Sequence, residues 1–151
     1  EKEGGKVMVV SMGPAQAKNA LKECLSVGAD QAFLVTDRAF GGSDTLATSY
    51  ILSRAVRAVE QKTGESVDVI FCGKQAIDGD TGQTAPSIAE HLGMIRLTYI
   101  VSMEIKGDKV IAKRQVEEGV EIIEASLPVL CTATKESNKP DMLPSKAFLL
   151  P

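Results

Sequence analysis

Two short apolar runs, separated by one helical stretch, open the chain. Residues 6–11 (KVMVVS) and 31–36 (QAFLVT) have the β-rich composition of strands. Residues 15–27 between them carry apolar side chains at helical spacing, and Gly28 ends that stretch. The pattern therefore predicts a strand, a helix and a second strand.

A longer helix is predicted after the glycine-rich turn over residues 37–43. One apolar stripe at helical spacing runs along it, made of Ala47, Ile51, Leu52, Ala55, Val56 and Val59. Ser43 or Asp44 is the expected N-terminal cap, because short polar side chains accept hydrogen bonds from the first free amides of a helix. Gly64 is the expected end of this helix.

The second half of the chain is richer in strands. Residues 67–72 (VDVIFC) are mostly apolar and β-branched, which predicts a strand covered on both faces. A polar loop over residues 74–84 follows, and Pro86 to Gly93 predicts a helix with proline in its first turn. Four strand-like runs come next, at residues 97–105, 109–115, 119–125 and 129–134. The first three suit an antiparallel meander, and the fourth is expected to return to the main sheet.

This order of elements predicts an α/β fold. Strands that alternate with helices indicate a parallel sheet with helices on both faces, because parallel neighbours need a crossover connection. The meander adds an antiparallel hairpin region near the C-terminus. We expect residues 1–134 to form one α/β domain and residues 135–151 to form a tail that is cut short.

Composition and charge narrow the class of protein. With 151 residues, 44% hydrophobic and 25% charged, the chain is typical of one globular domain. A net charge of −3 gives no basic surface for nucleic acid, and no apolar run is long enough for membrane insertion. Cys24, Cys72 and Cys131 lie far apart among apolar residues, which favours small buried thiols in a reducing, cytoplasmic setting.

Candidate chemistry lies in loops that follow the strands, where parallel sheets usually bind ligands. In the loop over 74–84, Gly79 and Gly82 let the backbone approach a ligand, and Thr81, Gln83 and Thr84 offer donors at a helix N-terminus. Asp78 and Asp80 could accept hydrogen bonds from ribose hydroxyls. The same residues also fit an ordinary turn and helix cap, and both interpretations stay open.

The loop before the long helix is a second candidate. Thr45 and Thr48 are three residues apart on one helical face, so both hydroxyls could meet one ligand, or they could belong to a capping motif. His91, the only histidine, is expected at the surface. The sequence shows no acid–base pair, metal cluster or nucleophile motif, so we assign no catalytic residue and no metal ligand. Nucleotide binding is favoured over hydrolysis.

At residues 72–83 the chain reads CGKQAIDGDTGQ, which resembles the signature loop of electron transfer flavoprotein beta subunits. Similar segments are VSMGPAQA over 10–17, GADQAFLVTDRAFGGSDTLATS over 28–49 and ATKESNKP over 133–140. The resemblance covers nearly the whole chain. It implies a Rossmann-like fold of the adenine nucleotide alpha hydrolase type. It also implies a heterodimer with the electron transfer flavoprotein alpha subunit, which exchanges electrons with acyl-CoA dehydrogenase-type redox partners.

The resemblance also implies a cofactor site. The residues that match it are Met12, Thr45, Thr48, Gly73, Lys74, Gln75, Asp78, Gly79, Asp80, Thr81, Gln83 and Thr84. In simpler members of the family the nucleotide is a structural AMP, and in electron-bifurcating members it is a second FAD that accepts a hydride from NADH. Such NADH oxidation would need both the second FAD and the alpha subunit.

We expect FAD rather than AMP in this chain. The segment DRAFGGSDTLATS resembles the form found in FAD-binding members, and Gly41 and Gly42 would leave space for a flavin ring beside Thr45 and Thr48. Two departures from the family suggest a fragment, since the family's first strand and its C-terminal arm have no match here. The rival interpretation is a stand-alone adenine-nucleotide-binding regulatory domain resembling universal stress proteins, whose glycine-rich phosphate loop is absent.

Overall fold

The computed structural model describes residues 4–74, 81–134 and 137. These residues fall into two compact units, one that reaches to Gly42 and one that begins at Ser43. In the described part of the chain, no helix is both long and apolar enough to span a membrane.

The first unit is a small parallel strand–helix–strand motif. It contains β1 (Met8–Met12), a 3-10 turn, α1 (Lys18–Ser26) and β2 (Gln31–Val35). The two strands pair in parallel, from Met8 opposite Gln31 to Met12 opposite Val35. The Asp30 carboxylate accepts a hydrogen bond of 2.7 Å from the Val7 backbone N–H, which anchors the start of this pair. The predicted strand, helix and strand are confirmed.

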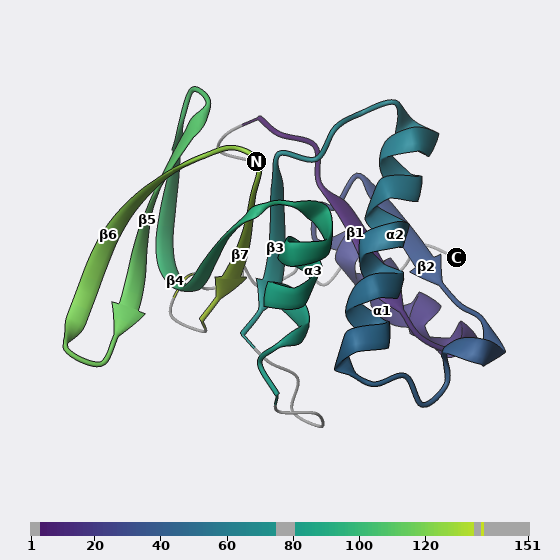
Figure 1. Ribbon diagram of the computed structural model, residues 1–151. Helices are drawn as coiled ribbons and strands as arrows, with labels where there is room; N and C mark the ends of the chain where they lie inside the picture. The colour runs from purple at the N-terminus through teal and green to yellow at the C-terminus, as the bar shows by residue number, and fades with distance from the viewer. Residues whose placement is uncertain (1–3, 75–80, 135–136, 138–151) are drawn as a thin grey trace. The chain divides into compact units, whose positions relative to one another are not determined.

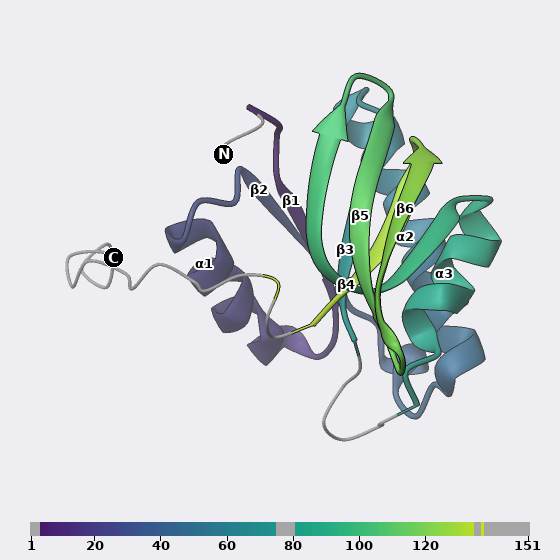
Figure 2. The same cartoon turned by 90° about the vertical axis from the view of Figure 1, so that its left-hand side faces the viewer.

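The second unit contains two helices and five strands (Figure 1). Its elements are α2 (Thr45–Thr63), β3 (Val69–Gly73), α3 (Thr84–Leu92), β4 (Ile95–Lys106), β5 (Lys109–Val116), β6 (Gly119–Ser126) and β7 (Val129–Ala133). Strands β4, β5 and β6 form the predicted antiparallel meander, whose long strands run side by side in Figure 2. Strand β7 returns to the sheet between β3 and β4 and is parallel to both.

The expectation of one parallel sheet needs correction. The larger sheet has the order β3-β7-β4-β5-β6 and is mixed, and β1 and β2 form a separate two-stranded sheet. The alternation of strands and helices along the chain correctly predicts the crossover connections. It does not predict that β4 is both a parallel neighbour of β7 and the first strand of the antiparallel meander. The fold is therefore a mixed α/β arrangement.

The ends of α2 follow from local sequence. The Asp44 side chain accepts a hydrogen bond of 2.8 Å from the Ala47 N–H, so Asp44 is the cap. Gly64 adopts a φ of 73° at the other end, a left-handed conformation that glycine adopts without steric cost. Helix α3 ends in the same way at Gly93. Both predicted helix ends are confirmed.

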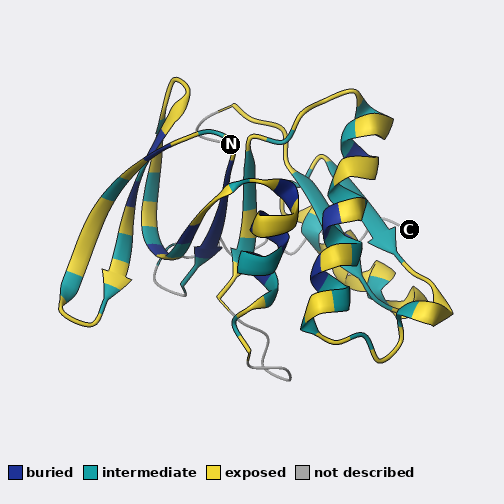
Figure 3. Cartoon of the chain, viewed as in Figure 1, coloured by how far each residue is buried: buried dark blue, intermediate teal, exposed yellow. Residues whose placement is uncertain are grey.

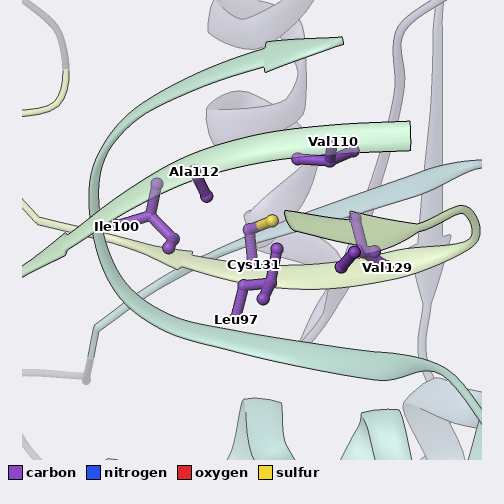
Figure 4. Packing of buried hydrophobic residues seen from close by; sticks show 7 residues of the cluster. Leu97, Ile100, Val110, Ala112, Val129 and Cys131 are labelled. Carbon is purple, nitrogen blue, oxygen red and sulfur yellow. The ribbon is translucent and has the colours of Figure 1, made fainter. Parts of the chain in front are cut away.

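Two apolar clusters lie on opposite faces of the larger sheet. One face carries α3 and part of α2, with Leu130 of β7 fully buried among their side chains. The other face is covered by the meander itself, and Figure 4 shows Leu97, Val110 and Cys131 pointing toward one another from β4, β5 and β7. In this unit both helices therefore cover the same face. Strand β7 is the most deeply buried element, dark blue in Figure 3.

Strand β3 departs from its predicted burial. Ile70 and Cys72 pack toward the helices, but Phe71 on the other face is 61% exposed. This strand forms one edge of the five-stranded sheet. The prediction of a strand covered on both faces is wrong for Phe71, because the apolar cluster on that face reaches Val69 but does not include Phe71.

Candidate functional site

Four element ends meet at one end of the larger unit. The carboxyl ends of the parallel strands β3 and β7 lie there, together with the amino ends of α2 and α3, toward the bottom of Figure 1. Backbone amides at a helix amino end point outward and carry a partial positive charge. This end of the sheet therefore has the general character of an anion-binding edge.

Lys74 is a positively charged residue at this edge. It follows β3 directly, is exposed, and places its Nζ atom 5.2 Å from the centre of the Tyr99 ring. The ring face attracts the ammonium group electrostatically, which holds the side chain near the sheet. Lys74 is thus a cation in a defined position at the end of β3.

Gly73, the last residue of β3, is not explained by the described fold. Its backbone is outside the left-handed region, and a Cβ atom built on it meets no atom within 4 Å. Gly64 and Gly93, in contrast, are required by their positive φ angles. Open space therefore lies beside Gly73, next to Lys74.

The amino end of α3 differs from that of α2. Thr84 is the first residue of α3, and Gln83 in the capping position makes no side-chain hydrogen bond to the helix. The Thr81 hydroxyl only approaches the Gln83 N–H, at 3.4 Å, and Pro86 contributes no amide hydrogen. In α2 the Asp44 carboxylate already occupies the equivalent place. Among the described residues, no side chain caps the positive end of α3, so this end can accept an external anion.

Thr45 and Thr48 both lie in the first turn of α2 and are partly buried. The cap of this helix is supplied by Asp44, and the Thr48 N–H bonds to the Asp44 carbonyl at 2.9 Å. Among the hydrogen bonds of the described residues, neither threonine hydroxyl takes part. The capping interpretation therefore does not need these hydroxyls, and both are available to a ligand.

Five predicted site residues have no place in this geometry. Gln75, Asp78, Gly79 and Asp80 lie outside the described residues. Met12 is the last residue of β1 and belongs to the first unit. Their assignment to the nucleotide site stays a prediction.

The cysteines behave as structural residues. All three are free, and Cys131 is fully buried with its Sγ atom 3.7 Å from the Met103 sulfur. Burial raises the pKa of the Cys72 thiol, and burial together with Cys72 raises the pKa of Cys131 to about 11. Both thiols are therefore protonated near neutral pH and are poor nucleophiles. His91 is exposed, as predicted. Its ring packs against the Tyr50 ring in a T-shaped arrangement, with the two ring centroids 5.7 Å apart.

Two residues of this edge, Tyr99 and Thr132, are not among the residues predicted for the site. Tyr99 falls in the strand expected over residues 97–105, and Thr132 in the strand expected over residues 129–134. The Thr132 side chain accepts a hydrogen bond of 2.9 Å from the Tyr99 N–H, although the residues are 33 positions apart. No local pattern signals such a contact, so only the structure could reveal it.

Comparisons with known proteins place the chain in a family. Residues 1–148 match the Electron transfer flavoprotein domain. The chain is 54% identical over 140 residues to the Electron transfer flavoprotein subunit beta of Thermoanaerobacterium thermosaccharolyticum, an alignment that covers 93% of this chain and 52% of that protein.

Two further relatives have other names. The Caffeyl-CoA reductase-Etf complex subunit CarD of Acetobacterium woodii is 47% identical, over 93% of this chain and 52% of its own length. Protein FixA of Azotobacter vinelandii is 49% identical, over 92% of this chain and 50% of its own length. The chain thus spans about half the length of these relatives. By the family match and these identities, it belongs to the electron transfer flavoprotein domain family and is of the beta-subunit type.

Proposed function

We propose that the chain forms the nucleotide-binding part of an electron transfer flavoprotein beta subunit, with the phosphates bound at the open amino end of α3. The observation that carries this proposal is the pairing of an uncapped, positive helix end with the positioned cation of Lys74 on the same edge of one sheet. Phosphate groups favour this combination of amides and charge.

The available groups fit a nucleotide. Lys74 and the first amides of α3 suit phosphate oxygens, the Thr84 hydroxyl can donate to them, and the space beside Gly73 admits a ligand close to the backbone. Gln75, Asp78, Gly79, Asp80, Thr81 and Gln83 would complete the contacts. The proposal includes a Rossmann-like fold of the adenine nucleotide alpha hydrolase type over residues 1–134. The parallel pairing of β1 with β2, and of β7 with β3 and β4, supports that fold.

FAD is the nucleotide that we propose, in preference to AMP. The two free hydroxyls of Thr45 and Thr48 support this choice, because AMP alone would need fewer hydrogen-bond donors. Gly42 has a φ of 76°, so the turn itself explains this glycine without a flavin ring. The preference for FAD over AMP therefore depends on Thr45 and Thr48.

FAD, when bound, would supply the redox chemistry, and the residues of this chain would bind and orient it. Thr45 and Thr48 would donate hydrogen bonds, and Lys74 would neutralise phosphate charge. The name of one relative, a subunit beta, supports an alpha subunit as partner, and the name of another, a subunit of a Caffeyl-CoA reductase-Etf complex, supports a redox enzyme as partner. We propose an enzyme of the acyl-CoA dehydrogenase type, as the family resemblance implies. We propose NADH oxidation only for the assembled protein, in which a second FAD is bound and the alpha subunit is present. The free thiols support a reducing, cytoplasmic location.

The proposal is tested by nucleotide binding to three variants of the protein assembled with an alpha subunit. Lys74→Met is expected to weaken binding about tenfold or more, because it removes a charge-assisted contact to phosphate. Gly73→Ala should also weaken binding but leave the midpoint of urea unfolding unchanged, because no described atom opposes the added Cβ. Lys113→Met, an exposed lysine on β5, is the matched control and should bind as the wild type does. Equal affinities for Lys74→Met and Lys113→Met would contradict the proposal.

A further inference from the structure

Tyr99 has an unusual backbone conformation. Its φ is 58°, and among the described residues it is the only non-glycine residue with a positive φ. Aromatic side chains rarely occupy this left-handed region, because the Cβ atom crowds the backbone. Strain of this kind persists where the surroundings enforce it, and it is often associated with a functional role.

The strain coincides with an irregularity in β4. The register of β4 against β7 shifts between Leu97 and Ile100, and both of these residues point into the buried cluster beneath the meander. In a regular strand residues 97 and 99 would share a face, and Tyr99 would enter that cluster. The irregularity turns Tyr99 away from it.

A buried threonine fixes this conformation. The Tyr99 N–H donates a hydrogen bond of 2.9 Å to the Thr132 hydroxyl, and Thr132 is 2% exposed in β7, between β3 and β4. Directly after it, Ile100 pairs with Ala133, and its carbonyl accepts a hydrogen bond of 3.1 Å from the Thr134 N–H. The hydrogen-bonded pairing of β4 with β7 therefore resumes on the carboxyl side of Tyr99.

Core packing does not account for the placement of the ring. The Tyr99 residue is 41% exposed, so the strain is not offset by deep burial. The ring contacts the Lys74 ammonium, which lies 5.2 Å from the ring centre. Strands β3 and β4 flank β7 on opposite sides. The contact between Lys74 and Tyr99 therefore passes over the carboxyl end of β7.

We propose that Tyr99 is a positioning residue of the nucleotide site, whose ring holds the Lys74 ammonium ready for the phosphate of a bound nucleotide. This inference rests on the proposed function. A free lysine side chain must lose rotational freedom when it binds phosphate, and a contact that restricts it beforehand lowers that cost. In this proposal, the irregularity of β4 and the Thr132 hydrogen bond place the Tyr99 ring against the Lys74 ammonium.

Two substitutions separate this role from a structural one. Tyr99→Phe keeps the ring and its attraction for a cation. Tyr99→Asn removes the ring but tolerates the left-handed conformation better than tyrosine does, so the fold should be as stable as that of the wild type, or more so. A purely structural role predicts that Tyr99→Asn binds nucleotide normally.

The experiment measures AMP affinity by calorimetry in the protein assembled with an alpha subunit and stripped of its bound nucleotides. AMP is the probe because FAD contains the same adenosine monophosphate group. We expect Tyr99→Phe to stay within about twofold of the wild type, and Tyr99→Asn to weaken binding about tenfold, the scale of one cation–π contact. In a Lys74→Met background, Tyr99→Asn should cause no further loss, because the ring acts only through the lysine. Normal AMP affinity for Tyr99→Asn, or an additional loss in the Lys74→Met background, would overturn the inference.

A second readout distinguishes this inference from the proposed function. In proton NMR spectra of the free chain, the ring should shift the signals of the Lys74 side-chain methylene groups upfield, in the wild type and in Tyr99→Phe but not in Tyr99→Asn. If that shift is present and Lys74→Met still binds AMP normally, the proposed site is wrong and the inference falls with it. If Lys74→Met weakens AMP binding and Tyr99→Asn does not, the site stands and the role of Tyr99 is refuted.

Discussion

Glu60 links three separate parts of the larger unit, and its replacement gives a prediction with a distinct pH signature. Its Oε1 atom accepts a hydrogen bond of 2.9 Å from the Val67 N–H, just before β3. Its Oε2 atom accepts one of 2.9 Å from Arg57, and Arg57 also donates to the Leu92 carbonyl at the end of α3, at 3.0 Å. The carboxylate therefore helps to tie both helices to the sheet.

The expected cost of Glu60→Gln follows from these contacts. Glutamine can still accept from Val67, but it loses the negative charge that faces Arg57. A hydrogen bond to a charged group contributes about 1.5–3 kcal/mol when buried, and an exposed ion pair contributes below about 1 kcal/mol. The Glu60 side chain is 17% exposed and that of Arg57 is 50% exposed, so the pair lies between these limits. We expect the free energy of unfolding to fall by about 1 kcal/mol at neutral pH.

The pH dependence identifies the cause. The Val67 N–H, and then Arg57, hold the pKa of Glu60 below its ordinary value of 4.5. A carboxyl group with a lowered pKa in the folded protein stabilises the fold above its unfolded pKa, and this stability disappears as the pH falls through the folded pKa. The difference between wild type and Glu60→Gln should therefore be full at neutral pH and shrink steadily below about pH 4.5.

Urea unfolding followed by circular dichroism at several pH values measures this difference. Glu90→Gln is the matched control, because Glu90 is an exposed carboxylate on α3. It should leave the unfolding midpoint unchanged at every pH. A Glu60→Gln cost that does not change with pH, or that equals the cost of Glu90→Gln, would refute the reasoning.

Two further predictions concern the fold. Leu130→Ala should lower the free energy of unfolding by about 3–5 kcal/mol in urea titrations, because Leu130 is fully buried between β7 and the helices and the substitution leaves a cavity; a loss below 1 kcal/mol would contradict this packing. Gly93→Ala should cost about 1 kcal/mol, because alanine is strained at a φ of 68°. The matched Gly73→Ala should cost nothing measurable, and equal costs for the two would show that the backbone argument is wrong.

Local sequence was sufficient for the elements and their ends, as Asp44, Gly64 and Gly93 illustrate. Each acts within a few residues of its own position, through a side-chain cap or a left-handed backbone. The meander was also predictable, because its strands are consecutive and joined by short turns. The mixed sheet was not, since it depends on β7 inserting beside β4, a pairing between segments about 30 residues apart.

The candidate site also contains residues that local sequence predicts and residues that it does not. Lys74 and Thr84 could be proposed from their place after a strand and at the start of a helix. Tyr99 could not, because its conformation depends on the Thr132 hydroxyl in another strand. Resemblance to a family supplied the expectation of a nucleotide ligand, because the residue pattern alone was compatible with both a nucleotide site and an ordinary turn.

The most direct test of the account is the nucleotide content of the protein assembled with an alpha subunit. Nucleotides are released by denaturation, separated by chromatography and quantified by absorbance, in the wild type and in Lys74→Met. The account predicts two FAD per wild-type heterodimer and the loss of one of them in Lys74→Met. One FAD with one AMP would contradict the choice of FAD, and a nucleotide content that is the same in both proteins would contradict the site itself.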